Sequence, residues 1–495
     1  MKIMKTHIKL FYLLFLFSFF GCNDFLDENP KTFTNPQNLM KSQNGVEQAV
    51  NGIYNAGFAV YADRTIHLVT TINTDEAWAP NYFTGERYEL MAYAFDPTCP
   101  PILTVYGAYV TAINRANMVL DNFPETGTLG IQNEQRFLDY KKGEALFLRA
   151  WYYFKHMSTF GPVPLLTTFN EVELYPSNST IPEIYDQIIA DLTEAERLLP
   201  NWKESYAEPG RATRGAAKSL LGIVYLTRAT SEAGTSNDYQ LAASKFKEVI
   251  DNEGYDLWEN YADAFIPAHK NQKEDIFSHQ ALANTIFPSR MYSEFVPSPP
   301  PTGASRGYGL AAVTKRVYNS YEPNDKRLSI FVSGDYVVRS TGEVHHTEFN
   351  YHEKYLDPVN GPLNYNNHST NMPLIRYADV LLSYSEAINA INGPTAEAYY
   401  GLNRIRTRAG LEPLSGLSKE AFFEEIVMER ARELFCEGVR WFDLKRWGLL
   451  KRAEDRGETG VNIEGIRVVL PKHSVFPFPQ REIDANPNLK QNPGY

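Results

Sequence analysis

The chain has 495 residues, and its 59 acidic side chains outnumber 48 lysines and arginines, for a formal net charge of −11 at pH 7. This acidity argues against a nucleic-acid partner, because phosphate backbones bind basic surfaces. Three cysteines do not make a disulfide framework. Stability must therefore come from a hydrophobic core, and on length alone the chain can form two or three domains.

Residues 1–21 have the pattern of a secretory signal. Three lysines precede an apolar run over residues 10–21, and Gly21 is the small residue at its end. The run is shorter than the ~20 apolar residues that span a bilayer. Without residues 1–21 the chain loses three lysines and no acids, so its net charge becomes −14.

Cys22 follows this segment directly, and acidic residues follow Cys22, which is typical of a lipoprotein signal. In that chemistry the thiol of Cys22 receives a diacylglyceryl group, and cleavage leaves Cys22 as the first residue. Two acyl chains anchor a protein stably where one does not. Phe20 stands where Ala or Ser is usual. A plain secretory signal and a membrane span are the alternatives.

Helical periodicity recurs over much of the remaining chain. The clearest helical segments are residues 134–157, 181–200, 215–230, 239–255 and 374–393.

A finer pattern repeats within the predicted helices, with spacings of four, three and five residues. It occurs at Ile188, Leu192, Ala195 and Pro200, at Ala242, Phe246, Val249 and Gly254, and at Ala398, Leu402, Ile405 and Gly410. Three apolar residues share one face and a Pro or Gly ends the helix, as in the second helix of a tetratricopeptide-type pair. The first helices fit less evenly, although Gly222 is placed to admit a partner closely. An ordinary helical bundle is the alternative.

Residues 60–100 and 260–370 are rich in Tyr, Phe, Pro, Asn and Gly, and their helical periodicity is poor. Short strands are expected at 335–340 and 466–471. A helical scaffold with long loops places binding sites in those loops. For description we divide the mature chain into residues 22–270 and 271–495.

The segment 418–448 predicts a capped amphipathic helix. Ser418 caps it, and Gly438 ends it. Its apolar face consists of Phe423, Val427, Ala431, Leu434 and Phe435. Trp441, Leu444 and Trp447 form a second stripe, so we expect Trp441 and Trp447, with Trp151, in the core.

Several stretches together resemble the SusD/RagB family. They are "CNDFLDENP" (22–30), "TDEAW" (74–78), "INRANMVL" (113–120), "RYADVLLSYSEA" (376–387), "ERARELFCEGVRWFDLKRWG" (429–448) and "FPFPQREIDANPNLKQNPGY" (476–495). The resemblance covers essentially the whole mature chain. Cys436 and Phe478 stand where smaller apolar residues are common.

The resemblance implies a mainly α fold with a tetratricopeptide-like helical repeat scaffold. Long insertions, which are rich in loops and contain few strands, form the side that binds the ligand. The resemblance also implies a lipid-anchored protein on the outer face of a Bacteroidetes-type outer membrane. Such a protein binds an oligosaccharide and delivers it to a SusC-like TonB-dependent transporter, which the helical side meets. It has no catalytic activity. A peptide-binding subunit, as in the RagB branch, and an extracellular hydrolase are the alternatives.

A pyranose has apolar faces and a hydroxyl rim, so its site needs aromatic surface with polar groups at the edge. Two predicted loop regions offer this combination, and the family's ligand contacts commonly lie in them. The candidates are Trp78, Asn81, Tyr82, Arg87 and Tyr88 in the first region and Arg290, Tyr292 and Tyr308 in the second. The alternative is that these rings cover the core.

Two further stretches resemble an enzyme motif or a metal-binding group. "GASRG" (303–307) matches a nucleophile elbow, but prolines rather than a strand precede it. Three loop histidines with carboxylates at 343–353 can assemble a metal site, although Leu356 stands where a zinc protease needs its second histidine. We expect no cofactor. The sequence leaves two questions open, whether a calcium ion braces a loop and whether Cys99 and Cys436 form a disulfide bond.

Overall fold

The computed structural model describes residues 35–62, 65–80, 85–170, 173–299, 307–360, 364–455 and 468–495. The predicted signal, Cys22, Asn81 and Tyr82 lie outside these ranges, and the lipid anchor therefore stays a prediction. Among the described helices, none is long and apolar enough to cross a membrane.

Long helices build most of the molecule. They are α3 (Gln43–Ala62), α6 (Pro100–Asp121), α7 (Glu134–Phe160), α8 (Ile181–Leu198), α9 (Arg214–Arg228), α10 (Asp238–Glu248), α13 (Tyr377–Asn392), α14 (Ala396–Arg408) and α15 (Lys419–Glu433). Shorter helices are α2 (Pro36–Leu39), α4 (Thr65–Thr70), α5 (Gly85–Ala92), α11 (Met291–Phe295), α12 (Lys315–Tyr318), α16 (Arg440–Arg446) and α17 (Gln480–Ala485). Most of the short helices fall in the segments of poor periodicity or near the C-terminus.

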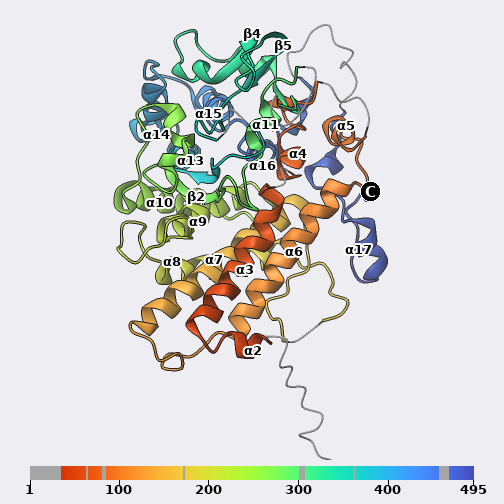
Figure 1. The fold of residues 1–495 in the computed structure, drawn as a ribbon, viewed down its shortest axis with the longest axis vertical. Helices are drawn as coiled ribbons and strands as arrows, with labels where there is room; N and C mark the ends of the chain where they lie inside the picture. The colour runs from red at the N-terminus through yellow and green to blue at the C-terminus, as the bar shows by residue number, and fades with distance from the viewer. Residues whose placement is uncertain are drawn as a thin grey trace, which may run out of the picture.

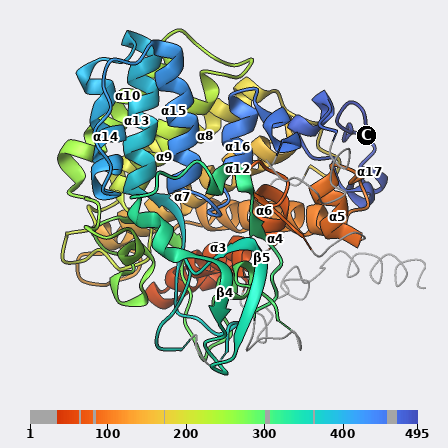
Figure 2. The same ribbon diagram turned by 90° about the horizontal axis from the view of Figure 1, so that it is seen from above.

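The long helices pack as the predicted pairs, α7 with α8, α9 with α10 and α13 with α14. Figure 2 shows α9, α10, α13, α14 and α15 gathered on one side of the molecule. Every apolar residue of the repeated pattern in α8, α10 and α14 is fully buried. The mainly α, tetratricopeptide-like fold is thus confirmed.

Glycines allow two of these pairs to approach closely. A Cβ at Gly222 of α9 would lie 2.5 Å from the Phe246 ring of α10, as its position in the pattern predicts. In the pair α13–α14 the small residue is Gly401, on the second helix. A Cβ at Gly401 would lie 2.1 Å from the Leu381 carbonyl oxygen of α13. The sequence of α13 alone therefore lacked the expected signal.

The C-terminal helix differs from its prediction in its end, in its buried face, which holds Phe422 and Ile426 while Phe423 is half-buried, and in the burial of one tryptophan. The Ser418 hydroxyl accepts from the Ala421 amide at 3.2 Å, as a cap should, but the helix ends at Glu433, before Gly438. Gly438 has φ +75° in the turn that follows. Trp441 and Trp151 are both buried, as expected. Trp447 is only half-buried, and its indole Nε1 donates a hydrogen bond to Glu386 Oε1 at 2.8 Å.

Within the described residues, six short strands form two small antiparallel sheets. They are β1 (Ala77–Trp78), β2 (Asp275–His279), β3 (Ala312–Val313), β4 (Phe331–Val337), β5 (Val344–His352) and β6 (Met372–Arg376). One sheet has the order β1-β3-β5-β4, and the other pairs β2 with β6. The hairpin β4–β5 lies at one end of the molecule, beside α11 and far from α2 and α8 (Figure 1).

One predicted strand is right over its first half, and the described part of the other, residues 468–471, is not a strand. The expected strand at 335–340 overlaps β4. The described part of 466–471 is irregular and runs into a 3₁₀ helix, Pro471–Ser474. There the Val469 amide donates to Glu454 Oε1 at 2.8 Å, and Pro471 has no amide hydrogen for a ladder.

A buried ionic network fixes the C-terminal helix to the elements around it. Glu433 of α15 accepts from Arg327, Arg376 and Arg408, and all four side chains are at most 8% exposed. Burial alone would raise the pKa of Glu433, but the three guanidinium groups hold it far below its usual range. Losing one arginine would leave a charge uncompensated in the core.

One further expectation is settled by the structure. Cys99 and Cys436 are both buried and free, so the disulfide alternative is wrong. The division between residues 270 and 271 stays a prediction, and helices from its two sides, α10 and α13, pack directly against each other.

Candidate functional site

The fold brings the two predicted binding regions together. Strand β1 of the first region pairs with β3, directly after the second region, in the register Trp78↔Ala312. Arg87 Nη1 lies 3.6 Å from Glu294 Oε2 of α11. Regions that are more than 200 residues apart in the sequence therefore lie next to each other, near the β4–β5 hairpin.

Trp78 does not present a ring to solvent. Its side chain is 1% exposed and meets Phe349 of β5 edge-on at 5.3 Å between ring centroids. A sugar needs an open ring face, and this indole has none in the structure. Its place fits the alternative that this ring covers the core, while its role in ligand binding stays a prediction.

The other predicted residues are only partly accessible. Tyr88 is half-buried against the core, Arg87 is held by Glu294, and Arg290 is exposed at the start of α11. Tyr308 is half-buried, and its hydroxyl accepts from Asn366 Nδ2 at 3.0 Å. These side chains surround α11 without converging on one point.

Tyr292 lines an open cleft of about 450 Å³, which we call the tyrosine cleft. Its walls come from four segments of the chain. These are α11 with the two residues that follow it, β4 with the turn that follows it, the residue directly after β5, and the segment before β6. The walls consist of Tyr292, Val296, Pro297, Val332, Tyr336, Val337, Val338, Arg339, Glu353 and Tyr365. Aromatic and aliphatic surface thus meets one guanidinium and one carboxylate.

A hydrogen-bonded chain crosses the tyrosine cleft. The Tyr292 hydroxyl donates to Glu353 Oε1 at 2.8 Å, and Arg339 Nε donates to the same oxygen at 2.6 Å. Burial, and next the charge of Glu353, raise the pKa of the Tyr292 phenol far above its usual value. The phenol therefore stays a neutral donor, and the charges of Arg339 and Glu353 offset each other.

Tyr292 itself is fixed in place. Its ring stacks on His368 at 4.8 Å and meets Tyr365 edge-on at 4.8 Å, and its side chain is 1% exposed. The more accessible groups are Tyr336, which is half-buried, and Arg339, which is exposed. Aromatic area on a fixed frame with polar groups at the edge is what a sugar ring requires.

Of the residues that line the tyrosine cleft, the candidates from the sequence include Tyr292 but not Tyr336, Arg339, Glu353 or Tyr365. The segment 335–340 signalled a strand, but nothing in it indicated that the end of this strand turns toward α11. Glu353 looked like part of a histidine-rich group. The hairpin pairing, with Tyr336 opposite His345, brings Tyr336, Arg339 and Glu353 to α11.

The histidine-rich segment is a strand and not a loop. His345 and His346 lie in β5 beside Glu343 and Asp335, at 3.5 Å and 2.8 Å, and His352 is 1% exposed. Within the described ranges, no group of three or more His, Cys, Asp and Glu side chains is placed to hold a metal ion. The side chains of this segment instead pair with each other or pack in the core.

Comparison with known proteins agrees with the fold and the motifs. A sequence profile described as SusD family matches residues 333–495, and one described as starch-binding associating with outer membrane matches residues 24–226. SusD-like protein P2 of Formosa agariphila is 29% identical, over 98% of this chain and 99% of that protein. The chain belongs to the SusD/RagB family.

Two other SusD/RagB relatives have lower sequence identity but also match most of the chain. The starch-binding protein SusD of Bacteroides thetaiotaomicron is 22% identical, over 87% of this chain and 85% of that protein. A SusD superfamily structure from Parabacteroides distasonis is 27% identical, with a TM-score of 0.76, and covers 91% of this chain and 99% of its own. The SusD/RagB fold thus extends over nearly the whole described chain.

Proposed function

We propose that this SusD/RagB protein is a lipid-anchored glycan-binding protein of the outer membrane, which captures an oligosaccharide and passes it, uncleaved, to a SusC-like TonB-dependent transporter. The family supports this proposal, since the profile that matches residues 24–226 describes starch binding and outer-membrane association, and the SusD relative is named for starch binding. The predicted diacylglyceryl group on Cys22 supplies the anchor.

The observation that carries the proposal is the composition of the tyrosine cleft. Tyr336 offers a partly open aromatic ring, while the exposed Arg339 and the half-buried Glu353 offer donors and acceptors for hydroxyl groups. An open cleft with a balanced pair of charges suits a neutral glycan. A peptide ligand would draw on unpaired backbone groups at a strand edge or on deep side-chain pockets.

A glycan array followed by calorimetry tests the proposal. We expect saturable binding of at least one oligosaccharide class, with affinity reduced about tenfold in Tyr336→Ala, since a ring against a ligand face contributes roughly 1–3 kcal/mol. Tyr175→Ala is the matched control, because Tyr175 is 49% exposed and lies outside the cleft. Binding of peptides in place of glycans would support the RagB-like alternative.

The absence of turnover is tested in the same samples. Incubation of the bound oligosaccharide with the protein should release no new reducing ends. Release that disappears in Glu353→Gln would instead identify a hydrolase. Delivery is tested by co-purification of the wild-type protein with its outer-membrane transporter, and membrane attachment by labelling with radioactive palmitate, which Cys22→Ser should abolish.

A further inference from the structure

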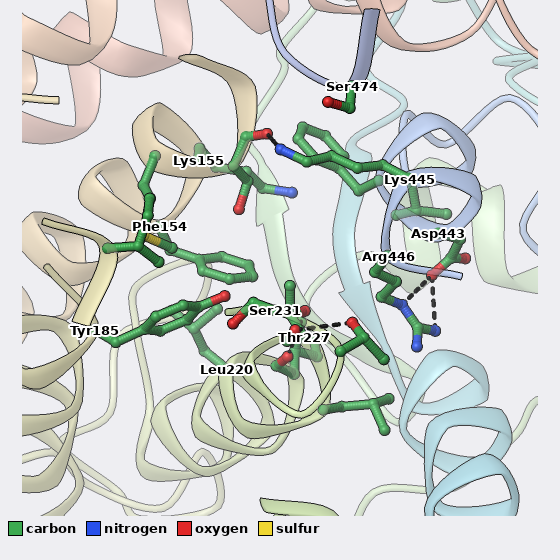
Figure 3. Close-up of a pocket in the computed structure, with 18 of the residues that line it drawn as sticks. Phe154, Lys155, Tyr185, Leu220, Thr227, Ser231, Asp443, Lys445, Arg446 and Ser474 are labelled. Carbon is green, nitrogen blue, oxygen red and sulfur yellow. Dashed lines mark hydrogen bonds and ion pairs between the residues drawn. The ribbon is translucent and has the colours of Figure 1, made fainter. Parts of the chain in front are cut away.

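A second cavity, unrelated to the tyrosine cleft, lies within the helical scaffold. It has a volume of about 470 Å³ and lies among α7, α8, α9 and α16, as Figure 3 shows. We call it the scaffold cavity. It shares no lining residue with the tyrosine cleft. Its volume falls in the range of ~300–1,000 Å³ that small-molecule sites occupy.

Most of the wall of the scaffold cavity is apolar. The residues that contribute to it include Phe154 of α7, Tyr185 of α8, Leu220 and Ile223 of α9 and Phe442 of α16. The labelled side chains of Phe154, Tyr185 and Leu220 lie along one side of Figure 3. An apolar wall of this kind favours a ligand with an aliphatic or aromatic body.

One end of the scaffold cavity carries two ammonium groups, those of Lys155 from α7 and Lys445 from α16 (Figure 3). Lys445 Nζ donates to the carbonyl oxygen of Ser158, which lies one helical turn beyond Lys155. Lys155 Nζ lies 4.3 Å from the centre of the Phe442 ring and 5.0 Å from that of Trp151. It makes no hydrogen bond to any residue that the structure describes.

The carboxylates nearby already have partners. Asp379 accepts from Arg430 Nη1 at 2.7 Å, and Asp443 accepts from Arg430 Nε at 2.7 Å and from Arg446 Nε at 3.0 Å. The described lining holds four cationic side chains and three carboxylates, of which Glu232 is exposed at the rim. Lys155 and Lys445 are therefore the two cationic side chains of the described lining that have no carboxylate partner among the described residues.

Burial also weakens the charge of both lysines. It lowers the pKa of Lys155 to about 8, although Asp379 and Asp443 act in the opposite direction, and it lowers the pKa of Lys445 to about 8. Both groups are therefore protonated at pH 6.5 and largely neutral at pH 9.5. A partially buried ammonium without an acceptor has a desolvation cost that a bound anion would offset.

We infer that the scaffold cavity binds a small organic carboxylate, whose anionic head meets Lys155 and Lys445 and whose apolar body lies against α8 and α9. This second site does not depend on the proposed glycan function. A carboxylate with a chain of moderate length fits both ends of the cavity, whereas a neutral sugar would leave the ammonium of Lys155 without a counter-ion.

Calorimetric titration of the purified protein with octanoate tests this inference. We expect saturable one-to-one binding at pH 6.5, weakened about tenfold or more in Lys155→Met and to a similar degree at pH 9.5, because a charge-assisted contact is lost in both cases. Octanol, the neutral counterpart, should bind wild type and Lys155→Met alike. Lys247→Met, at a lysine outside the cavity, is the control and should bind octanoate as wild type does.

Three results would overturn the inference. The first is the absence of saturable octanoate binding, and the second is equal octanoate affinity in wild type and Lys155→Met. The third is undiminished octanoate affinity in Leu220→Phe, in which the larger side chain reduces the volume of the cavity. Circular dichroism establishes that each variant is folded, and Lys155→Arg, which keeps the charge, should retain binding if the head-group contact is electrostatic. Glycan binding by Lys155→Met should equal that of wild type, which separates this test from that of the proposed function.

Discussion

Asp75 and Arg440 form a buried two-point ion pair that joins two distant family motifs. Arg440 Nε and Nη2 donate to the two Asp75 carboxylate oxygens, each at 2.7 Å, and neither residue is more than 1% exposed. Asp75 lies in "TDEAW" directly before β1, and Arg440 begins α16. The pair thus fastens the sheet beside the tyrosine cleft to the C-terminal helices.

Loss of one partner of this pair should be costly. We expect Asp75→Asn to lower the free energy of unfolding by about 3–5 kcal/mol, because it leaves Arg440 charged and uncompensated in the core. Urea denaturation measures this. The exposed pair Arg197–Glu194 is the control, and Glu194→Gln should cost less than about 1 kcal/mol. An equally small effect in both variants would contradict the structural role of the pair.

Glu76 should make stability depend on pH. Burial raises its pKa to about 8, although Arg440 acts to lower it. A raised pKa in the folded state means that the stabilising contribution of Glu76 is complete below pH 4.5 and is lost as pH rises through 8. Relative to wild type, Glu76→Gln should therefore gain stability over this window, by up to about 1.4 kcal/mol per pH unit. Denaturation at pH 5, 7 and 8.5 measures the difference, and a constant offset would refute the assignment.

His156 should act in the opposite direction. Its ring packs between Tyr106 and Phe160, neither ring nitrogen has a hydrogen-bond partner in the described chain, and burial lowers its pKa to about 3. Stability linked to the neutral ring is complete above pH 6.5 and is lost as pH falls toward 3. His156→Phe should thus unfold at lower pH than wild type in an acid titration followed by circular dichroism. An unchanged acid midpoint would show that His156 does not contribute.

Two glycines give a matched test of the helix pairing. Gly222→Ala should destabilise the protein by about 1–3 kcal/mol, because the new Cβ would lie 2.5 Å from the ring of Phe246, which is fully buried. Gly107→Ala in α6 meets nothing within 4 Å and should stabilise by about 0.5–1 kcal/mol. Thermal unfolding of the two variants should shift in opposite directions, and a shift of the same sign in both would argue against the close α9–α10 contact.

The sequence was informative wherever one residue pattern determined the structure locally. The repeated spacing at Ile188, Leu192 and Ala195 predicted a buried helix face, and Gly222 predicted a close approach, because both follow from helical geometry alone. Trp78 shows the limit of this reasoning. A tryptophan next to polar residues looks accessible in the sequence, yet pairing of β1 with β3 and contact with Phe349 bury it.

The candidate site was less predictable than the scaffold, because it depends on long-range pairing. Tyr336 and Arg339 reach Tyr292 only through the β4–β5 hairpin, and no local pattern specifies where such a hairpin packs. Glu353 was grouped with the histidines near it in the sequence, whereas its partners in space are Arg339 and Tyr292. Pairwise contacts between distant segments thus define the tyrosine cleft.

Calorimetric titration of wild type and Tyr336→Ala with an oligosaccharide selected from a glycan array tests the central claim most directly. The account predicts saturable binding to wild type, about tenfold weaker binding to Tyr336→Ala, and unchanged binding to Tyr175→Ala. Equal affinity in all three proteins would show that the ligand binds outside the tyrosine cleft, and the absence of any glycan ligand would contradict the proposed function itself.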